Sequence, residues 1–298
     1  MKRLIRKALK QIRDATFRDM AREIETNRIL AAKLLISQLH ESGEPKTLHE
    51  SEFKVFSQWG EDGIIQYLIR HVVIENDTFV EFGASNYLES NTRFLLINNN
   101  WSGLVMDGDP ENVSLIKSDP IYWRYNLKAD CSFITKDNIN DLLESNGVSG
   151  DIGLLSVDID GNDYWVWKEI EVISPRVVVL EYNSRFGAER AVTIPYDENF
   201  IRQKAHFSSI YFGASLKALV NLSKQKGYSF VGCNTNGVNA FFVRSDLLAK
   251  PLQELTVEEG YIEGKFREAR DVNGDLSFMD AEQERNILDS LPLIELDE

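Results

Sequence analysis

The chain has 298 residues, of which 43% are hydrophobic and 27% charged, an ordinary globular composition that excludes a disordered or low-complexity protein. Its net charge of −14 argues against general binding to nucleic acid. No apolar stretch reaches the roughly 18 residues of a membrane span. The two isolated thiols, Cys131 and Cys233, fit a reducing cytoplasm better than a disulfide framework.

The N-terminal segment, residues 1–45, differs from the rest of the chain in pattern and charge. Apolar residues recur there at helical spacing, which predicts a helix over residues 2–40. Residues 1–33 carry ten Lys and Arg against four Asp and Glu, so the other 265 residues have a net charge of −20. The helix has two interpretations. It lies on an anionic membrane or a partner, or it packs on its own domain or on a second copy of the chain.

Short apolar strands alternate with helices from residue 50 onward, a pattern typical of a parallel, doubly wound sheet. The predicted strands cover residues 78–82, 103–107, 123–127, 152–158 and 176–181, with helices over 87–99, 110–117, 136–146 and 162–173 between them. A helix over 216–226 then precedes two strands, 228–233 and 239–243, joined by a short loop rich in Asn and Gly. This last pair predicts an antiparallel hairpin.

We therefore expect an α/β domain over residues 46–250, with a Rossmann-like sheet that finishes in an antiparallel strand. Residues 251–298 hold fourteen Asp and Glu against four Lys and Arg. We interpret this acidic segment as a C-terminal appendage or a lid.

The first candidate ligand site follows the strand over residues 78–82. Glu81 stands at the strand end, and Gly83, Ala84 and Ser85 form a small-residue turn before the next helix. Ligands of open α/β sheets lie outside the carboxyl ends of the strands, near the point where the strand order reverses. Ser85 stands where a nucleotide-binding fingerprint needs a second Gly, which argues against a pyrophosphate cradle. A plain strand-to-helix turn is the alternative.

Two further acids stand at the ends of the next strands. Asp107 could accept hydrogen bonds from both hydroxyls of a ribose, and Asp130 could accept one from an exocyclic amine such as adenine N6. Each alone could be a solvated loop carboxylate. Three acids at successive strand ends favour a ligand site.

A cluster of three acids follows the strand over residues 152–158. Asp158, Asp160 and Asp163 lie within six residues, so their mutual repulsion calls for a bound cation or a protonated group. Glu181 and Asn183, at the end of the next strand, would face them. Carboxylate and amide oxygens suit Mg²⁺ or Mn²⁺. The alternatives are an ordinary turn, and a Glu and an Asn that bind loop backbone.

His206 is the one histidine for which the sequence suggests a role. It lies in a loop rich in Ser, Gly and aromatic residues, and a base near its normal pKa suits removal of a hydroxyl proton. A structural or surface histidine is the alternative.

The order and spacing of these pieces resemble the FkbM-like branch of class I S-adenosylmethionine-dependent methyltransferases over about residues 53–245. The matching pieces are Phe56-Ser-Gln-Trp-Gly-Glu-Asp62, Phe79-Val-Glu-Phe-Gly-Ala84, Ser90-Asn-Thr92, Trp101-Ser-Gly-Leu-Val-Met-Asp107, Leu155-Ser-Val-Asp-Ile-Asp-Gly161, Val178-Val-Leu-Glu181, Tyr211-Phe-Gly-Ala-Ser-Leu216 and Asn239-Ala-Phe-Phe-Val243.

The resemblance implies a seven-stranded sheet with an antiparallel last strand and a site for S-adenosylmethionine. By this analogy Glu81, Gly83 and Ala84 line the methionine part of the cofactor, Asp107 holds the ribose, Asp130 the adenine, and Asp158 lies near the sulfonium. Gln58, Ser85 and Asn91 belong to matching or adjoining pieces, and we assign them to the same site.

The resemblance also implies methyl transfer to a hydroxyl of a sugar or glycan. Some relatives use Mg²⁺ held at the ends of the fourth and fifth strands, an arrangement that Asp158 or Asp160 with Glu181 and Asn183 resembles. Glu181 stands where those enzymes more often have Asp. Asp160 or His206 is then the expected base.

Three aromatic residues, Trp165, Tyr182 and Phe186, are candidates for stacking on a sugar, with packing in the core as the alternative for at least one of them. We expect a small-molecule or glycan acceptor, no nucleic acid, and a cytoplasmic protein that contacts the inner membrane face or a partner through residues 1–33. A homo-oligomer is compatible with the sequence. The alternatives are a methyltransferase with a non-sugar acceptor and a catalytically silent module of a glycan-assembly complex.

Overall fold

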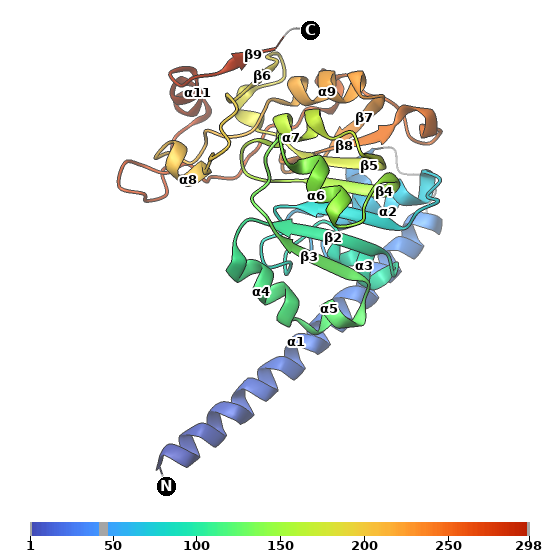
Figure 1. Ribbon diagram of the computed structural model, residues 1–298, viewed down its shortest axis with the longest axis vertical. Helices are drawn as coiled ribbons and strands as arrows, with labels where there is room; N and C mark the ends of the chain where they lie inside the picture. The colour runs from blue at the N-terminus through green and yellow to red at the C-terminus, as the bar shows by residue number, and fades with distance from the viewer. Residues whose placement is uncertain (1, 42–46, 297–298) are drawn as a thin grey trace. The chain divides into compact units, whose positions relative to one another are not determined.

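The computed structural model describes residues 2–41 and 47–296, and the chain forms two compact units, Met1–Pro45 and Lys46–Glu298. The first contains α1 (Lys2–Glu41), which confirms the helix expected over residues 2–40 (Figure 1). Most side chains before residue 19 lie outside the described residues, including five of the apolar residues that recur at helical spacing, Leu4, Ile5, Leu9, Ile12 and Phe17. No helix among the described residues is long and apolar enough to cross a membrane.

A seven-stranded sheet forms the centre of the second unit, in the order β3-β2-β1-β4-β5-β8-β7 (Figure 1). The first five strands in this order are parallel, and β8 runs antiparallel to both neighbours. The Rossmann-like sheet with an antiparallel last strand is thus confirmed. The strands are β1 (Thr78–Phe82), β2 (Ser102–Asp107), β3 (Leu127–Cys131), β4 (Gly150–Val157), β5 (Ile173–Glu181), β7 (Tyr228–Cys233) and β8 (Asn239–Arg244).

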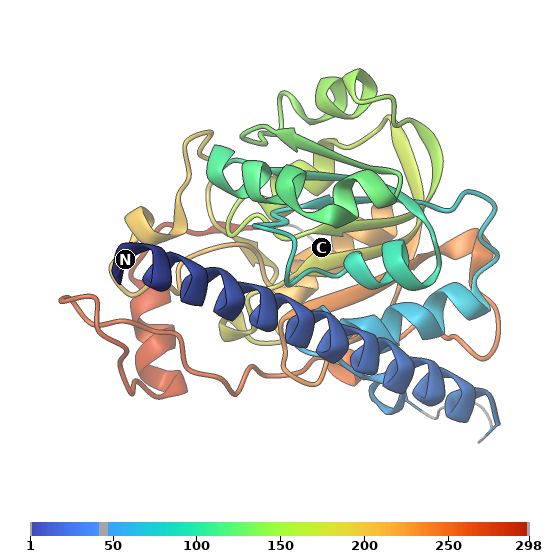
Figure 2. The same cartoon turned by 90° about the horizontal axis from the view of Figure 1, so that it is seen from below.

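Helices cover both faces of this sheet (Figures 1 and 2). Side chains alternate along a strand, so Val80 and Phe82 of β1 belong to one apolar core and Phe79 belongs to the other. One core is closed by α6 (Ile139–Ser145), α7 (Asp163–Glu169) and α9 (Leu216–Gln225); the other by α2 (Glu61–His71), α3 (Arg93–Asn98), α4 (Pro110–Ser118) and α5 (Pro120–Arg124).

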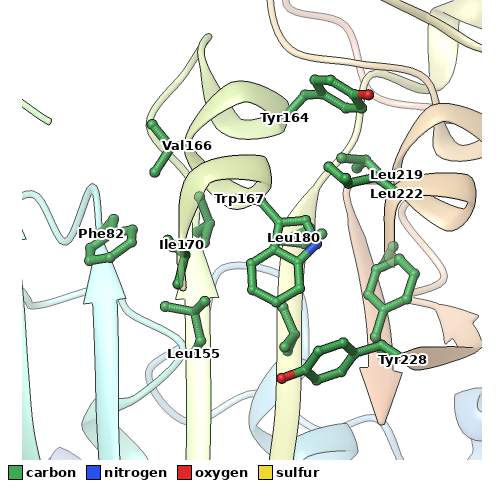
Figure 3. Close-up of a cluster of buried hydrophobic side chains, with 14 of the residues drawn as sticks. Phe82, Leu155, Tyr164, Val166, Trp167, Ile170, Leu180, Leu219, Leu222 and Tyr228 are labelled. Atoms are coloured by element: carbon green, nitrogen blue, oxygen red, sulfur yellow. The ribbon is translucent and has the colours of Figure 1, made fainter. Parts of the chain in front are cut away.

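Trp167 of α7 is the largest buried side chain of the first core (Figure 3). Its indole packs edge-on against Tyr228, with ring centroids 5.3 Å apart, and its Nε1 donates to Ser223 Oγ at 3.1 Å. This bond satisfies the one polar atom of the ring, so the indole is buried without a desolvation penalty. The contact fixes α7, and with it the loop that carries the acids after β4.

The prediction of a strand over residues 123–127 is wrong. Residues Pro120–Arg124 form α5, and β3 begins at Leu127. Asp119 caps this helix by accepting from the amide of Ile121 at 2.9 Å, with Pro120 in the first turn. This helix-start signal outweighs the β propensity of the residues that follow it.

Residues 251–296 pack within the second unit. Strand β9 (Ile294–Glu295) pairs with β6 (Val192–Thr193), and Ala269 and Leu288 share a small core with Val192. The remaining short elements are η1 (Leu48–Ser51), η2 (Ser184–Phe186), α8 (Arg202–Ala205), η3 (Ser245–Leu247), α10 (Val257–Gly260) and α11 (Ala281–Asp289). The acidic segment is therefore tied to the 184–211 region by backbone pairing and apolar contact.

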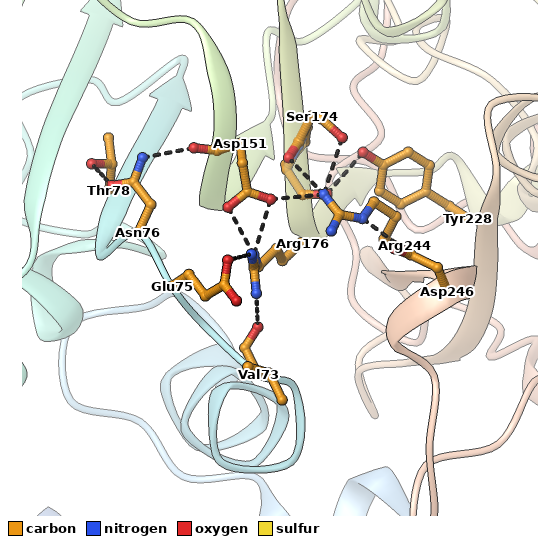
Figure 4. Close-up of polar contacts among 11 residues, drawn as sticks. Val73, Glu75, Asn76, Thr78, Asp151, Ser174, Arg176, Tyr228, Arg244 and Asp246 are labelled. Atoms are coloured by element: carbon orange, nitrogen blue, oxygen red, sulfur yellow. Dashed lines mark hydrogen bonds and ion pairs between the residues drawn. The ribbon is translucent and has the colours of Figure 1, made fainter.

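Arg176 of β5 joins three segments at the amino ends of the parallel strands (Figure 4). Its guanidinium is buried, and Nε donates to both carboxylate oxygens of Asp151 at 3.0 and 2.8 Å. Nη2 donates to Glu75 Oε2 at 2.8 Å, and Nη1 bonds to the carbonyl oxygen of Val73. Arg244 binds the same Asp151 at 2.8 Å. Burial acts to raise the pKa of the Asp151 carboxyl, but Arg176 and Arg244 together hold it below its ordinary value.

The replacement Arg176→Met should lower the free energy of unfolding by about 2–4 kcal/mol, because it leaves Asp151 and the carbonyl of Val73 short of a donor. Urea denaturation measures the change. The control is Arg190→Met, whose exposed pairs with Asp289 and Glu295 should contribute less than about 1 kcal/mol. Equal losses in the two variants would contradict this account of Arg176.

Candidate functional site

A cavity of about 460 Å³ lies at the carboxyl ends of the parallel strands. The sheet order reverses between β1 and β4, and the cavity is lined by residues that follow both of these strands. Ligands of open α/β sheets bind at such a switch point. The lining residues are Gln58, Trp59, Gly83, Ser85, Met106, Asp107, Gly108, Asn112, Ser132, Phe133, Ile134, Asp158, Ile159, Asp160, Asn162, Glu181, Phe200, Arg202, Val238, Phe266 and Glu268.

Gly83 lets the turn after β1 pass against the backbone that follows β4. Its φ is +72°, and a Cβ at this position would overlap the carbonyl oxygen of Asp158. Both facts require glycine here. The amide of Gly83 donates to the carbonyl of Met106 at 3.0 Å, and Ser85 follows with a φ of +47°. The predicted turn thus lies on the cavity wall.

Asp107, at the end of β2, lines the cavity in a fixed orientation. Its Oδ2 accepts from the amide of Ser85 at 2.8 Å, and its Oδ1 accepts from the amide of Asp109 at 2.8 Å and from Asn112 Nδ2 at 3.0 Å. A carboxylate has about four acceptor sites. Three are in use, and one stays available on Oδ2 for a ligand hydroxyl.

Glu81 lies behind the cavity. Its carboxylate accepts from Ser90 Oγ at 2.6 Å, from the amide of Asn91 at 2.9 Å and from Thr92. Burial raises its pKa, and these hydrogen bonds oppose that rise. Asn91 in turn donates to Ser156 Oγ at 3.1 Å. Glu81, Asn91 and the buried Ala84 therefore support the turn and are absent from the cavity lining.

Asp130, the candidate for binding adenine, also lies outside the lining. It accepts from Asn146 Nδ2 at 2.8 Å and from Ser132 Oγ at 3.2 Å. Ser132 and Phe133, the residues that follow β3, line the cavity in its place. No signal in the sequence distinguished Phe133 from other loop residues.

The structure brings three acids together at the ends of β4 and β5. Carboxylate oxygens of Asp158, Asp163 and Glu181 lie within 4.8 Å of one another. Asp163 accepts from the amides of Ile159 at 2.8 Å and Gly161 at 2.9 Å, so its orientation is fixed. Glu181 Oε2 is buried without a hydrogen-bond partner. The prediction that Asp158 and Glu181 face each other agrees with this geometry.

Burial and like charge raise the proton affinity of this cluster. Burial, together with the charges of Asp160 and Asp163, raises the pKa of Asp158 to about 8. Burial and the charge of Asp158 raise the pKa of Glu181 well above its ordinary value. Burial raises the pKa of Asp163 to about 6, against its two backbone bonds. At neutral pH the cluster therefore holds a proton or requires a cation.

Asp160 is exposed at the cavity and pairs with a cation that the sequence did not single out. Its φ is +57°, and its Oδ1 accepts from Arg202 Nη1 at 2.7 Å. Arg202 also binds Glu268 at 2.8 Å. Burial acts to lower the pKa of Arg202, but the charges of Glu181, Glu268 and Asp160 outweigh it and raise that pKa. Asp160 therefore lies beside the Asp158–Glu181 pair with its charge balanced by Arg202.

Two predicted residues are not brought to the cavity. Asn183 is buried, and its Nδ2 donates to the carbonyls of Ile210 at 2.9 Å and Phe212 at 3.1 Å. His206 pairs with Ser208 Oγ at 2.7 Å, burial lowers its pKa, and it does not line the cavity. The contacts of Asn183 match the alternative of an Asn that binds loop backbone, and those of His206 match the alternative of a structural histidine.

Aromatic residues do line the cavity, but they differ from the three candidates. Tyr182 and Phe186 are buried, and Trp165 Nε1 donates to the carbonyl of Ile194 at 2.9 Å. The rings in the lining are Trp59, Phe133, Phe200 and Phe266. Trp59 and Phe266 stack with centroids 5.2 Å apart and ring planes at 30°. Trp59 belonged to a matching piece of sequence; nothing indicated Phe266.

The loop over residues 55–60, which carries Gln58 and Trp59, is held by the first two residues of α2. Asp62 Oδ2 accepts from the amides of three successive loop residues at 2.7–2.8 Å, and burial raises its pKa to about 6. Glu61 accepts from the amide of Trp59 at 2.8 Å and from Asn234 and Asn239 at 2.7 and 2.9 Å. Glu61 and Asp62 thus place Gln58 and Trp59 on the cavity wall.

No protein-family model matches the chain, and no curated protein matches it. Among solved structures it is similar to a putative caffeoyl-CoA O-methyltransferase from Staphylococcus aureus, at 12% identity over 72% of this chain and 99% of that one, with a TM-score of 0.44. An S-adenosylmethionine-dependent methyltransferase from Clostridium acetobutylicum matches at 11% identity over 69% of this chain and 94% of that one, with a TM-score of 0.40. An O-methyltransferase from Bacillus cereus matches at 12% identity over 71% of this chain and 88% of that one, with a TM-score of 0.36.

The raised pKa values of Asp158 and Glu181 predict that stability falls as pH rises. The unfolded chain releases both protons near pH 4. In the folded protein Asp158 has a pKa of about 8, and the pKa of Glu181 is raised well above its ordinary value. Folding therefore loses free energy across this interval. Glu181→Gln removes one acid and should make the decline between pH 5 and 8 shallower, by on the order of 1 kcal/mol or more.

Urea denaturation at a series of pH values, with a metal chelator present, measures this slope. The control is Glu263→Gln, which replaces an exposed carboxylate outside the cavity and should leave the slope unchanged. A slope in Glu181→Gln equal to that of the unmodified protein would show that the pair does not hold the proton.

Proposed function

We propose that the protein is an S-adenosylmethionine-dependent O-methyltransferase that acts on a hydroxyl of a sugar or glycan. The observation that carries the proposal is the position of Asp107 and Gly83 on one cavity at the switch point of the sheet. An oriented acid at the end of β2 suits a ribose, and a glycine turn after β1 lets a ligand approach the backbone. The strand order with an antiparallel β8 agrees with this class of fold.

The cofactor would lie across the ends of β1, β2 and β3. Asp107 would accept from the ribose hydroxyls, with the Asn112 amide beside it as a second polar group. The adenine would lie against Phe133 next to Ser132, and the methionine part would pass the turn at Gly83. This turn would be supported from outside the cavity by Glu81, Ala84 and Asn91, which would not contact the cofactor themselves.

Methyl transfer is an in-line displacement in which the sulfur–methyl bond breaks while the oxygen–methyl bond forms. The acceptor hydroxyl loses its proton, so a base must stand within hydrogen-bond reach. Asp158 lines the cavity, and with a pKa of about 8 its deprotonated fraction is a stronger base than an ordinary carboxylate, a fraction that grows as the pH approaches 8. Asp160 is the second candidate, but its Oδ1 already accepts from Arg202 Nη1 at 2.7 Å.

A divalent cation fits part of the predicted ligand set. The unpartnered Glu181 Oε2 and the grouped oxygens of Asp158, Asp163 and Glu181 offer hard donors for Mg²⁺ or Mn²⁺. Asn183, whose amide binds two carbonyls, would not be a ligand in this arrangement. A cation held there would supply positive charge that lowers the pKa of the acceptor hydroxyl.

Residues 1–33 bear on where the protein works and what it contacts. We expect it to work in the cytoplasm, with a small-molecule or glycan acceptor and, for residues 1–33, contact with an anionic membrane or a partner. The excess of positive charge in this segment over a strongly negative remainder supports the contact.

The cofactor assignment is tested by calorimetric titration with S-adenosylhomocysteine. The protein should bind at one saturable site, and Asp107→Asn should weaken binding by about 10–100-fold, because a charged acceptor for the ribose is lost. The matched control is Asp130→Asn, at the end of the neighbouring strand and outside the cavity, which should bind within about twofold of the unmodified protein. Absent binding, or equal loss in both variants, would refute the cofactor site.

The base is tested with any hydroxyl acceptor that the protein methylates. Asp158→Asn should lower kcat by about 100-fold or more while binding of S-adenosylhomocysteine persists, and Asp160→Asn should lower it less. His206→Asn should leave kcat unchanged, because His206 lies outside the cavity lining. A full kcat in Asp158→Asn would refute Asp158 as the base. A greater loss of kcat in Asp160→Asn than in Asp158→Asn would identify Asp160 as the base.

A further inference from the structure

The cavity has a second end that the proposed cofactor does not use. The first end is built by residues that follow β1, β2 and β3. The second is built by segments far apart in the sequence, namely the 55–60 loop, the turn after β4, the 200–202 region and the C-terminal segment. Trp59 stacks on Phe266, and Arg202 binds both Asp160 and Glu268, so these four segments meet at one place. This second end is where an acceptor would lie.

Arg202 is the one positively charged side chain among the lining residues, all of which belong to the described part of the chain. Its three nitrogens are engaged. Nη1 binds Asp160 at 2.7 Å, Nη2 binds Glu268 at 2.8 Å, and Nε donates to the carbonyl of Ser209 at 2.7 Å. The guanidinium also lies 3.7 Å from the ring centroid of Phe212. The cation is therefore already neutralised and held in place.

Acidic groups exceed cations at this end even when Asp158 and Glu181 are counted as neutral. Asp160 and Glu268 both line the cavity, and Arg202 pairs with both of them. Glu268 also lies 3.0 Å from Arg185 Nη1, but Arg185 is itself paired with Glu284 at 2.8 Å, so three acids here face two cations. An acceptor group with negative charge would meet repulsion, with no unpaired cation among the residues that line the cavity. Hydroxyl and ammonium groups would find carboxylate oxygens that accept hydrogen bonds.

Trp59 and Phe266 add apolar surface to the same wall. Both rings are half-buried and line the cavity, one from the 55–60 loop and one from the C-terminal segment. Rings of this kind bind the apolar face of a ligand, while neighbouring carboxylates bind its polar edge. A compact ring with hydroxyl groups presents both surfaces.

We propose that this second end binds an acceptor ring rich in hydroxyl groups that is uncharged or carries an amine, and that it excludes rings bearing phosphate or carboxylate. Glu268 and Asp160 set this preference by occupying Arg202, and Phe266 with Trp59 forms the apolar wall. The inference rests on the proposed function, since it assigns the acceptor half of that site. It gives the C-terminal segment a direct part in acceptor selection.

The test measures binding of four related probes to protein saturated with S-adenosylhomocysteine. The probes are methyl glucoside, methyl glucosaminide, glucuronic acid and glucose 6-phosphate, titrated by saturation-transfer NMR. The neutral and amine-bearing probes should bind at least about tenfold more tightly than the two anionic ones. Because saturation with S-adenosylhomocysteine is established first, a failed cofactor site is distinguished from a failed acceptor assignment.

Glu268→Gln removes one negative charge from this end without changing the shape of the side chain, and it ends the ion pairs of Glu268 with Arg202 and Arg185. It releases one side of Arg202, so glucose 6-phosphate should gain at least about fivefold in affinity and methyl glucosaminide should lose a similar factor. Glu263→Gln, an exposed carboxylate in the same segment outside the cavity, should alter neither. Unchanged binding of S-adenosylhomocysteine by both variants shows that they are folded.

Three outcomes overturn the proposal. The first is that the anionic probes bind as tightly as the neutral ones to the unmodified protein. The second is that Glu268→Gln changes the four affinities no more than Glu263→Gln does. The third is that protein saturated with S-adenosylhomocysteine binds none of the probes.

Discussion

The close approach of β1 and β4 at their carboxyl ends is the constraint on which the site depends. Gly83 allows it, because any side chain there would strike the carbonyl of Asp158. With the two turns in contact, Asp107 on one side and the acids of β4 and β5 on the other open onto one cavity. The apolar cores on both faces of the sheet, closed by α7 and α3 among others, hold the strands in this register.

The density of negative charge is the second constraint. Asp158, Asp163 and Glu181 are grouped and largely buried, an arrangement that costs stability at neutral pH unless a proton or a cation is present. Two backbone amides donate hydrogen bonds to the Asp163 carboxylate and stabilise part of this negative charge. One oxygen of Glu181 is left unpartnered. Such a cost is typical of a site that performs chemistry.

The sequence predicted the frame of the site well, because parallel strands with acids at their ends follow simple rules. The β1 and β2 regions, the hairpin and the meeting of Asp158 with Glu181 follow from apolar runs and side-chain alternation. The third strand was misplaced because an Asp-Pro cap starts a helix there. Local pattern carries no information on where a side chain turns, so the orientations of Asn183 and Asp130 were not predicted. Phe266 and Glu268 reach the cavity through tertiary packing of a segment more than 150 residues from Asp107.

The most direct measurement is a crystal structure of the protein with S-adenosylhomocysteine. The account predicts the ribose hydroxyls within hydrogen-bond distance of Asp107, the adenine against Phe133, and the sulfur directed toward Asp158. Density for the ligand at another place, or a ligand in the cavity whose ribose does not contact Asp107, would contradict it.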